Sequence, residues 1–128
     1  MSDISIGFIG LGNVGSKVAN NIISNGYKLY IHDLDKKKSD FLVSKGAIYC
    51  KNIEELISNV TVFITCLPSP KAVKTVILNI IPILNNGHLW IEMSTTDEHD
   101  MKYLSKLVID NKAEVVEAPI TGGQHRAQ

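Results

Sequence analysis

The sequence has few cysteines, no excess of either charge and no long apolar run. Its two cysteines, Cys50 and Cys66, are too few for a disulfide framework and do not form a Cys-x-x-Cys pair. The longest apolar stretch, Val76–Leu84, is interrupted by Asn79 and Pro82 and is far too short to span a bilayer. No positively charged segment precedes the first apolar residues, so a signal peptide is not expected. These absences favour a soluble, intracellular protein of the cytoplasm.

The charges balance, with 13 basic and 13 acidic residues in 128. Such a chain lacks the positive patch that nucleic acids or anionic membranes require, so neither is expected as a partner. No group of His, Cys, Asp and Glu has the spacing of a metal site. With 45% hydrophobic residues, the chain suits one domain with a core of its own.

Strand-like and helix-like segments alternate from end to end. Strands are predicted at residues 4–9, 28–32, 47–50, 60–66, 89–93 and 113–117, and helices at 13–25, 35–45, 52–58, from 70 towards 82–85, and at 97–111. In the helix at 35–45, Phe41 and Leu42 are expected to face the core. Alternation of this kind implies right-handed crossovers between parallel strands. The prediction is an α/β fold, a Rossmann-type doubly wound parallel sheet of about six strands with helices on both faces.

The most informative motif is the glycine pattern Gly10-Leu11-Gly12-Asn13-Val14-Gly15, which follows the first strand and opens the first helix. This context is typical of a dinucleotide-binding turn, in which the first glycine permits the tight turn and the third lets helix and strand pack closely. The second, Gly12, leaves room for a pyrophosphate at the helix N-terminus. The alternative is an ordinary glycine turn in an α/β protein.

An acidic residue, Asp33, ends the second strand eighteen residues after Gly15. A carboxylate at this point would accept hydrogen bonds from the ribose hydroxyls of an adenosine and repel a 2′-phosphate, which favours NAD over NADP. Lys36, Lys37 and Lys38 follow it. They are either a solvated helix face or a cationic cluster that tolerates some NADP.

Three further irregular segments fall at the carboxyl ends of predicted strands: Leu67-Pro68, Ser94-Thr95-Thr96 and Ala118–Gly123. In open parallel sheets these ends border the ligand crevice, so the segments are expected to converge on the nucleotide. Each also has a structural explanation as a proline turn, a helix cap or a glycine turn.

Four segments together resemble the β-hydroxyacid dehydrogenases, a group that includes 3-hydroxyisobutyrate dehydrogenase, tartronate semialdehyde reductase and 6-phosphogluconate dehydrogenase. They are GFIGLGNVG at the start, CLPSP after the fourth strand, EMSTTD at the fifth and EAPITGG at the sixth. The resemblance implies that Leu67 and Pro68 contact the cofactor and that Thr95 lies near its nicotinamide half. It also implies that Thr121, Gly122 and Gly123 help to bind the carboxylate of a small hydroxy acid.

Motif and resemblance together give one set of candidate residues. The cofactor is assigned to Gly10, Leu11, Gly12, Asn13, Val14, Gly15, Asp33, Leu67, Pro68 and Thr95, and the substrate to Thr121, Gly122 and Gly123. Arg126 is a possible second clamp on the substrate. Ala72 stands where many members of the resembled group have a cofactor-binding Asn, so that contact is not carried over.

The catalytic lysine of the resembled group lies well beyond the glycine pair, and no lysine of this chain occupies a matching position. Residues 1–128 are therefore interpreted as one dinucleotide-binding domain, with 119–128 opening the substrate-side segment. The all-helical second domain of the group is absent from the chain, which is expected to be inactive alone.

The function predicted is that of the NAD-binding domain of a 3-hydroxyacid dehydrogenase, which would act on a 3-hydroxyisobutyrate-like acid. Two alternatives stay open: a stand-alone, non-catalytic nucleotide-binding module, and a related reductase of small aldehydes or imines. A homo-oligomer is possible for the full-length protein.

Overall fold

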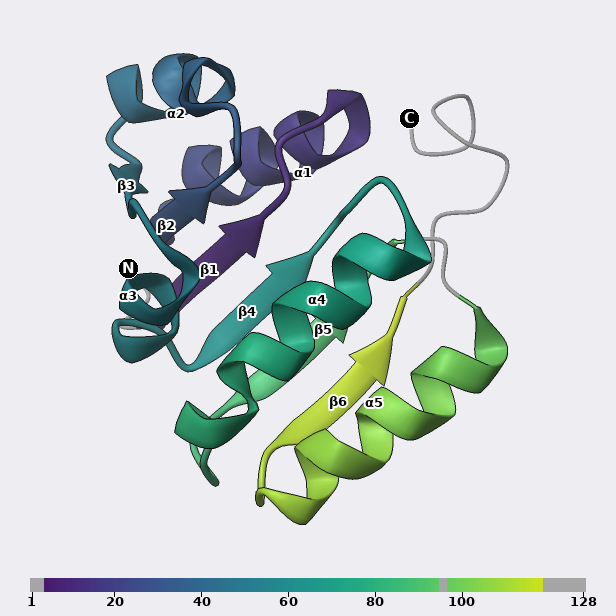
Figure 1. Ribbon diagram of the computed structural model, residues 1–128. Helices are drawn as coiled ribbons and strands as arrows, with labels where there is room; N and C mark the ends of the chain where they lie inside the picture. Colours follow the sequence, from purple (N-terminus) through teal and green to yellow (C-terminus); the bar gives the residue numbers. More distant parts are fainter. Residues whose placement is uncertain (1–3, 95–96, 119–128) are drawn as a thin grey trace.

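The computed structural model describes residues 4–94 and 97–118, and in this part of the chain six strands form one parallel sheet. The sheet has the order β3-β2-β1-β4-β5-β6 (Figure 1). Its strands are β1 (Ser5–Ile9), β2 (Lys28–His32), β3 (Ile48–Tyr49), β4 (Val62–Thr65), β5 (Leu89–Glu92) and β6 (Glu114–Glu117). Every predicted strand overlaps an observed one, and the predicted fold class is confirmed.

Helices connect successive strands. They are α1 (Asn13–Ser24), α2 (Asp40–Ser44), α3 (Ile53–Ser58), α4 (Pro70–Ile80) and α5 (Glu98–Asp110), with 3₁₀ turns η1 (Lys36–Ser39) before α2 and η2 (Ile81–Ile83) after α4. Side-chain oxygens of Asn52, Ser69 and Asp97 accept N–H groups in the first turns of α3, α4 and α5. Among the described residues, no helix is long and apolar enough to cross a membrane.

The predicted helix at 35–45 is in fact η1 followed by the five-residue α2, and one of its two predicted core contacts is wrong. Leu42 is buried, but Phe41 is 59% exposed. Adjacent residues of a helix point about 100° apart, so a short helix that packs one edge cannot bury both. The ammonium of Lys45 covers the Phe41 ring, 5.2 Å from its centroid.

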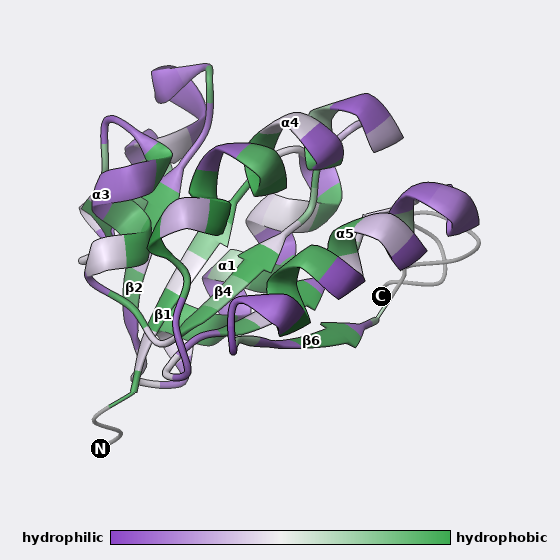
Figure 2. Cartoon of the chain, turned by 60° about the horizontal axis from the view of Figure 1, so that its bottom comes forward, coloured by the Kyte–Doolittle hydropathy of each residue, from purple (hydrophilic) through white to green (hydrophobic). Residues whose placement is uncertain are grey.

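Two apolar clusters fill the two faces of the sheet. One surrounds Trp90 and Phe63 beneath α3, α4 and α5, and the other surrounds Phe8 and Ile31 beneath α1 and α2. Figure 1 shows α4 and α5 together on one face of the sheet and α1 on the other. In Figure 2 the central strands are largely hydrophobic in colour, and the outer turns of the helices are mostly hydrophilic. Burial on both faces explains why the central strands are nearly continuous apolar runs.

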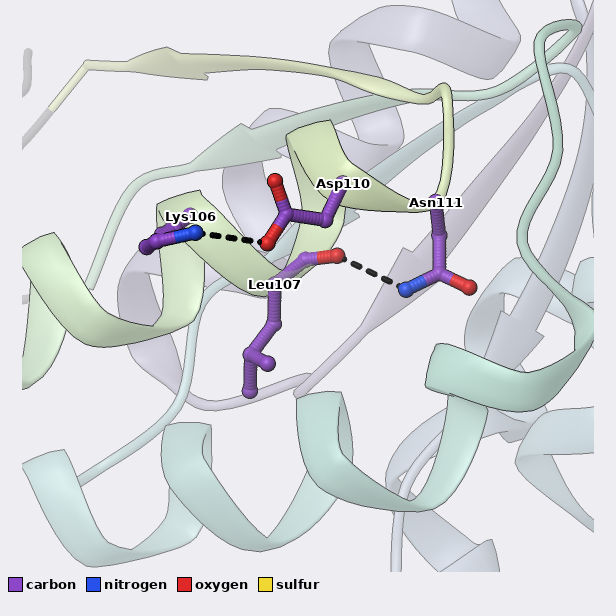
Figure 3. Close-up of polar contacts among 4 residues, drawn as sticks. All are labelled: Lys106, Leu107, Asp110 and Asn111. Carbon is purple, nitrogen blue, oxygen red and sulfur yellow. Dashed lines mark hydrogen bonds and ion pairs between the residues drawn. The ribbon is translucent and has the colours of Figure 1, made fainter.

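The C-terminal end of α5 is closed without a glycine: Lys112 has φ +72°, and the N–H groups of Lys112 and Ala113 donate to the carbonyls of Ile109 and Val108. Asn111 Nδ2 donates to the carbonyl of Leu107 at 2.9 Å, and Lys106 pairs with Asp110 at 2.8 Å on the exposed side (Figure 3). The Leu107 carbonyl also accepts the backbone N–H of Asn111 at 3.2 Å, so the side chain adds a second hydrogen bond to the same oxygen. The ion pair is exposed to solvent and contributes little to stability. The end of α5 leads directly into β6.

The strand order reverses between β1 and β4. From β1 the chain first builds β2 and β3 on one side of the sheet and then crosses to β4 on the other. At the carboxyl end of β1, Gly10 N donates to His32 O at 3.0 Å and Cys66 N donates to Ile9 O at 2.9 Å. Ligands of doubly wound folds bind at such a reversal point.

Candidate nucleotide-binding site

A cleft of about 880 Å³ opens at the carboxyl ends of β1 and β4, at the reversal point of the sheet. Its walls come from the glycine turn after β1, the segment after β2, the segment from β4 into α4, and the end of β5. Of the predicted cofactor residues, those that line it are Gly10, Leu11, Gly12, Val14, Gly15, Asp33, Leu67 and Pro68. The structure therefore brings together residues from three separate segments of the sequence.

Three predicted groups of residues are not at the cleft wall or are not described. Asn13 is exposed and is not among the lining residues. Thr95 lies outside the described residues, and so do Thr121, Gly122, Gly123 and Arg126. Their roles stay predictions.

Two of the three motif glycines are required by the protein itself. Gly10 has φ +101°, and a Cβ on it would collide with the carbonyl oxygen of Cys66 at the end of β4. A Cβ on Gly15 would collide with the carbonyl oxygen of Gly10. Gly10 thus allows both the turn and the close approach of β4, and Gly15 allows α1 to pack against that turn.

Gly12 differs from the other two because no protein atom requires a glycine there. Its φ is −70°, and a Cβ built on it would meet nothing within 4 Å. It is the N-cap of α1, and it provides no side chain to cap the first N–H groups of that helix. A bare, positively polarised helix end that faces an open cleft fits an anionic group such as a pyrophosphate. The residues present therefore fit a dinucleotide.

Asp33 is held directly against the glycine turn. Its Oδ2 accepts the Leu11 N–H at 2.7 Å, and its Oδ1 accepts the Asp35 N–H at 2.8 Å. The carboxylate is thus fixed at the mouth of the cleft, and each oxygen keeps a lone pair for a ribose hydroxyl. The preceding His32 is buried, with Nδ1 2.8 Å from the carbonyl oxygen of Cys50, and so has a structural contact of its own.

The three lysines Lys36, Lys37 and Lys38 have different surroundings. The ammonium of Lys36 lies over the Tyr49 ring, 5.4 Å from its centroid, and Lys37 is exposed. Only Lys38 of the three is among the residues that line the cleft. Lys36 and Lys37 therefore fit the solvated-face interpretation, and a role for Lys38 in tolerance of NADP stays a prediction.

A buried polar group at the end of β5 was missed by the sequence analysis. Glu92 is 1% exposed, and its carboxylate accepts hydrogen bonds from Thr65 Oγ1 at 2.9 Å and from the Ser94 N–H. Burial raises the pKa of Glu92, although the hydrogen bonds from Ser94 and Thr65 act against this and the charge of Glu117 adds to it. The available signal was a carboxylate between two apolar residues, Ile91 and Met93, at the end of a buried strand.

The two cysteines differ in their relation to the cleft. Cys66 lines it, whereas Cys50 is fully buried in the core. Burial, and after it the charge of Glu92, raises the pKa of Cys66. Burial, and after it the charge of Glu55, raises the pKa of Cys50 to about 11. Both thiols are therefore protonated and weakly nucleophilic at neutral pH. Within the described residues, no group of His, Cys, Asp and Glu could hold a metal ion.

The strand order, the glycine turn at the reversal point and the carboxylate at the end of β2 define a dinucleotide-binding domain of the Rossmann type. The chain belongs to the family described as the NAD binding domain of 6-phosphogluconate dehydrogenase, which matches residues 5–128. The resemblance found in the four sequence motifs is thereby confirmed, and the domain is an NAD(P)-binding one.

Similar proteins are named both as a dehydrogenase and as a nuclear factor. The mitochondrial 3-hydroxyisobutyrate dehydrogenase of Drosophila melanogaster is 34% identical over 120 residues, which cover 93% of this chain and 37% of the relative. The human cytokine-like nuclear factor N-PAC is 28% identical over 126 residues, which cover 96% of this chain and 23% of that protein. The chain thus spans about a quarter to two fifths of these relatives.

A solved structure has the same fold over almost the whole chain. The imine reductase from Pseudomonas sp. has a TM-score of 0.87 and 26% identity, covering 98% of this chain and 46% of that one. Because relatives are named as mitochondrial or nuclear, the cytoplasmic location expected from the sequence stays a prediction.

Proposed function

We propose that the chain is the NAD-binding domain of a dehydrogenase that oxidises a small 3-hydroxy acid, and that it binds NAD in preference to NADP. The observation that supports the cofactor preference is the position of Asp33. Its carboxylate is held at the cleft mouth by two backbone N–H groups, one of them from the glycine turn. A fixed negative charge there accepts ribose hydroxyls and repels a 2′-phosphate.

The roles proposed for the other residues combine the geometry of the cleft with the family resemblance. The pyrophosphate lies over Gly10–Gly15 at the N-terminus of α1, where Gly12 leaves space. Leu67 and Pro68 form the facing wall. Thr95 is assigned to the nicotinamide half on the family resemblance alone. The carboxylate of the substrate is assigned to Thr121, Gly122 and Gly123, where a hydroxyl and backbone N–H groups are suitable donors. When bound, the nicotinamide supplies the hydride chemistry.

Calorimetric titration of the 128-residue chain with NAD and NADP tests the cofactor preference. NAD is expected to bind more tightly, and Asp33→Asn is expected to narrow the difference because the repelling charge is removed. Asp35→Asn is the matched control, because Asp35 also lines the cleft and this substitution removes one negative charge, as Asp33→Asn does. It should change both affinities to a similar extent. Equal affinity for NAD and NADP in the unmutated chain would contradict the role of Asp33.

The substrate class is tested by NADH formation from 3-hydroxyisobutyrate. A longer protein that contains this domain together with a lysine-bearing helical domain is expected to form NADH. The 128 residues alone are not, because removal of the acid–base group typically costs about 10²–10⁴-fold in rate. Rapid NADH formation by the 128 residues would contradict this assignment. Reduction of a cyclic imine without oxidation of hydroxy acids would instead favour the reductase alternative, which the imine reductase structure supports.

N-PAC supports a second candidate function. It is a nuclear factor by name, is 28% identical to this chain and matches almost all of it. A non-catalytic nucleotide-binding module would keep the cleft and its cofactor affinity without hydride transfer. The same NADH assay separates the two functions, because only the dehydrogenase oxidises the acid.

A further inference from the structure

A buried series of hydrogen bonds runs from the single tryptophan of the sequence towards the cleft. Trp90 Nε1 donates to Thr65 Oγ1 at 2.8 Å, and Thr65 Oγ1 donates to Glu92 Oε2 at 2.9 Å. The other carboxylate oxygen of Glu92 accepts the Ser94 N–H. All four residues are at least nine-tenths buried. Thr65 and Glu92 are register partners on β4 and β5, which places their side chains side by side on one face of the sheet.

Ser94 connects these buried hydrogen bonds to the wall of the cleft through Leu67. Its Oγ accepts the Leu67 N–H at 2.7 Å. The last hydrogen bond between β1 and β4 is made by Cys66 N, so the N–H of Leu67 is the first one beyond the ladder. The Leu67 N–H is thus accepted by a serine hydroxyl instead of a strand carbonyl, at the point where the chain leaves β4 and borders the cleft.

The loop 66–69 that Ser94 holds forms one wall of the site. Cys66, Leu67, Pro68 and Ser69 all line the cleft. Leu67 lies across from the glycine turn, because a Cβ on Gly10 would come within 3.1 Å of Leu67 Cδ2. The distance between this wall and the glycine turn therefore depends on where the Leu67 backbone is held.

A carboxylate is a costly choice for this position in the core. Glu92 is almost completely buried, Glu117 is its register partner on β6, and an apolar side chain would avoid the loss of hydration. Its contribution is the fixed acceptor for the Ser94 N–H, which holds the Ser94 backbone in place. The Ser94 hydroxyl then donates to the carbonyl oxygen of Thr65 at 3.4 Å and accepts the Leu67 N–H.

We propose that Glu92 is a positioning residue for dinucleotide binding: through Ser94 it fixes the Leu67 backbone and thereby the wall of the cleft that faces the glycine turn. This relay of Glu92, Ser94 and Leu67 rests on the proposed function only in taking the ligand of the cleft to be NAD. Its structural part concerns the ligand-free protein and can be tested without a ligand.

The test combines Glu92→Gln, Ser94→Ala and the double variant in the 128-residue chain. Glutamine keeps the shape of Glu92 but offers one acceptor oxygen where the carboxylate has two. In each single variant, loss of one hydrogen bond of the relay is expected to raise the Kd for NAD about three- to tenfold. The double variant should bind no more weakly than Ser94→Ala alone, because Glu92 acts through Ser94. In the ligand-free protein, the Leu67 amide should exchange its hydrogen faster in all three variants.

His88→Leu provides the matched control. His88 is also buried and precedes the same strand, but its ring bonds Asn85 N and lies 3.2 Å from Ile57 O, and it does not line the cleft. This variant should lose stability without a change in Kd or in Leu67 exchange. If Glu92→Gln behaves in the same way, Glu92 is merely structural and the relay is refuted.

Two further measurements distinguish failure of the relay from misfolding of Glu92→Gln and from failure of the proposed function. Should Glu92→Gln not fold, Thr65→Val removes the hydroxyl that donates to Glu92, and Thr65→Ser retains it. The relay requires faster Leu67 exchange in Thr65→Val than in Thr65→Ser, and equal rates would overturn it. A wild-type chain that binds neither NAD nor NADP would contradict the proposed function, while Leu67 exchange would still decide for or against the relay.

Discussion

Replacement of Gly12 by aspartate is expected to abolish dinucleotide binding and leave the fold intact. A side chain at this position meets no protein atom, and φ is −70°, so the backbone accepts any residue. Aspartate is moreover a preferred N-cap and interacts favourably with the N-terminus of α1. The same carboxylate would occupy the space of the pyrophosphate and repel it. The affinity for NAD should fall by at least about 100-fold.

Calorimetry and urea unfolding measure the two halves of this prediction. The free energy of unfolding should stay within about 1 kcal/mol of the wild type. Gly12→Ser is the neutral control: it caps the helix in the same way without the charge, and its loss of affinity should be clearly smaller. If Gly12→Asp binds NAD as the wild type does, the pyrophosphate does not lie over the N-terminus of α1.

Gly10→Ala is expected to have the opposite effect, a large loss of stability. The residue has φ +101°, and an added Cβ would collide with the carbonyl oxygen of Cys66, which belongs to the neighbouring strand segment. The left-handed backbone costs about 1–2 kcal/mol for an alanine. Movement of the backbone to relieve the collision adds roughly 1–3 kcal/mol. The expected loss in the free energy of unfolding is therefore roughly 2–5 kcal/mol.

Gly26→Ala separates these two contributions. Gly26 has φ +89° after the end of α1, but an added Cβ would meet nothing within 4 Å. It should lose only the backbone contribution, about 1–2 kcal/mol. Urea unfolding, followed by the fluorescence of the buried Trp90, gives both values. A loss in Gly10→Ala no larger than that in Gly26→Ala would show that the contact with Cys66 places no constraint on the turn.

Much of the fold and part of the site could be predicted because they depend on short-range patterns. Continuous apolar runs of strand length, helices of the right length between them and residues such as Pro70 at a helix start are visible within a few neighbouring residues. The glycine motif is equally local, since it joins one strand to the next helix. The doubly wound parallel sheet followed from the alternation of elements and the rules for parallel crossovers.

The sequence by itself thus determined the α/β class, the positions of the strands, the glycine turn and, with Leu67-Pro68 and Ser94, two of the segments that border the cleft. Only the tertiary structure decided what depends on residues distant in the chain. Asp33 is tied to Leu11 across 22 positions, and Leu67 is tied to Ser94 across 27. Folding also decided that Phe41 faces outward while Leu42 faces inward, and that Lys38 rather than Lys36 borders the cleft. The physical reason is that a side chain finds its partner through the packing of the sheet and its helices, and neither residue type nor spacing along the chain records that geometry.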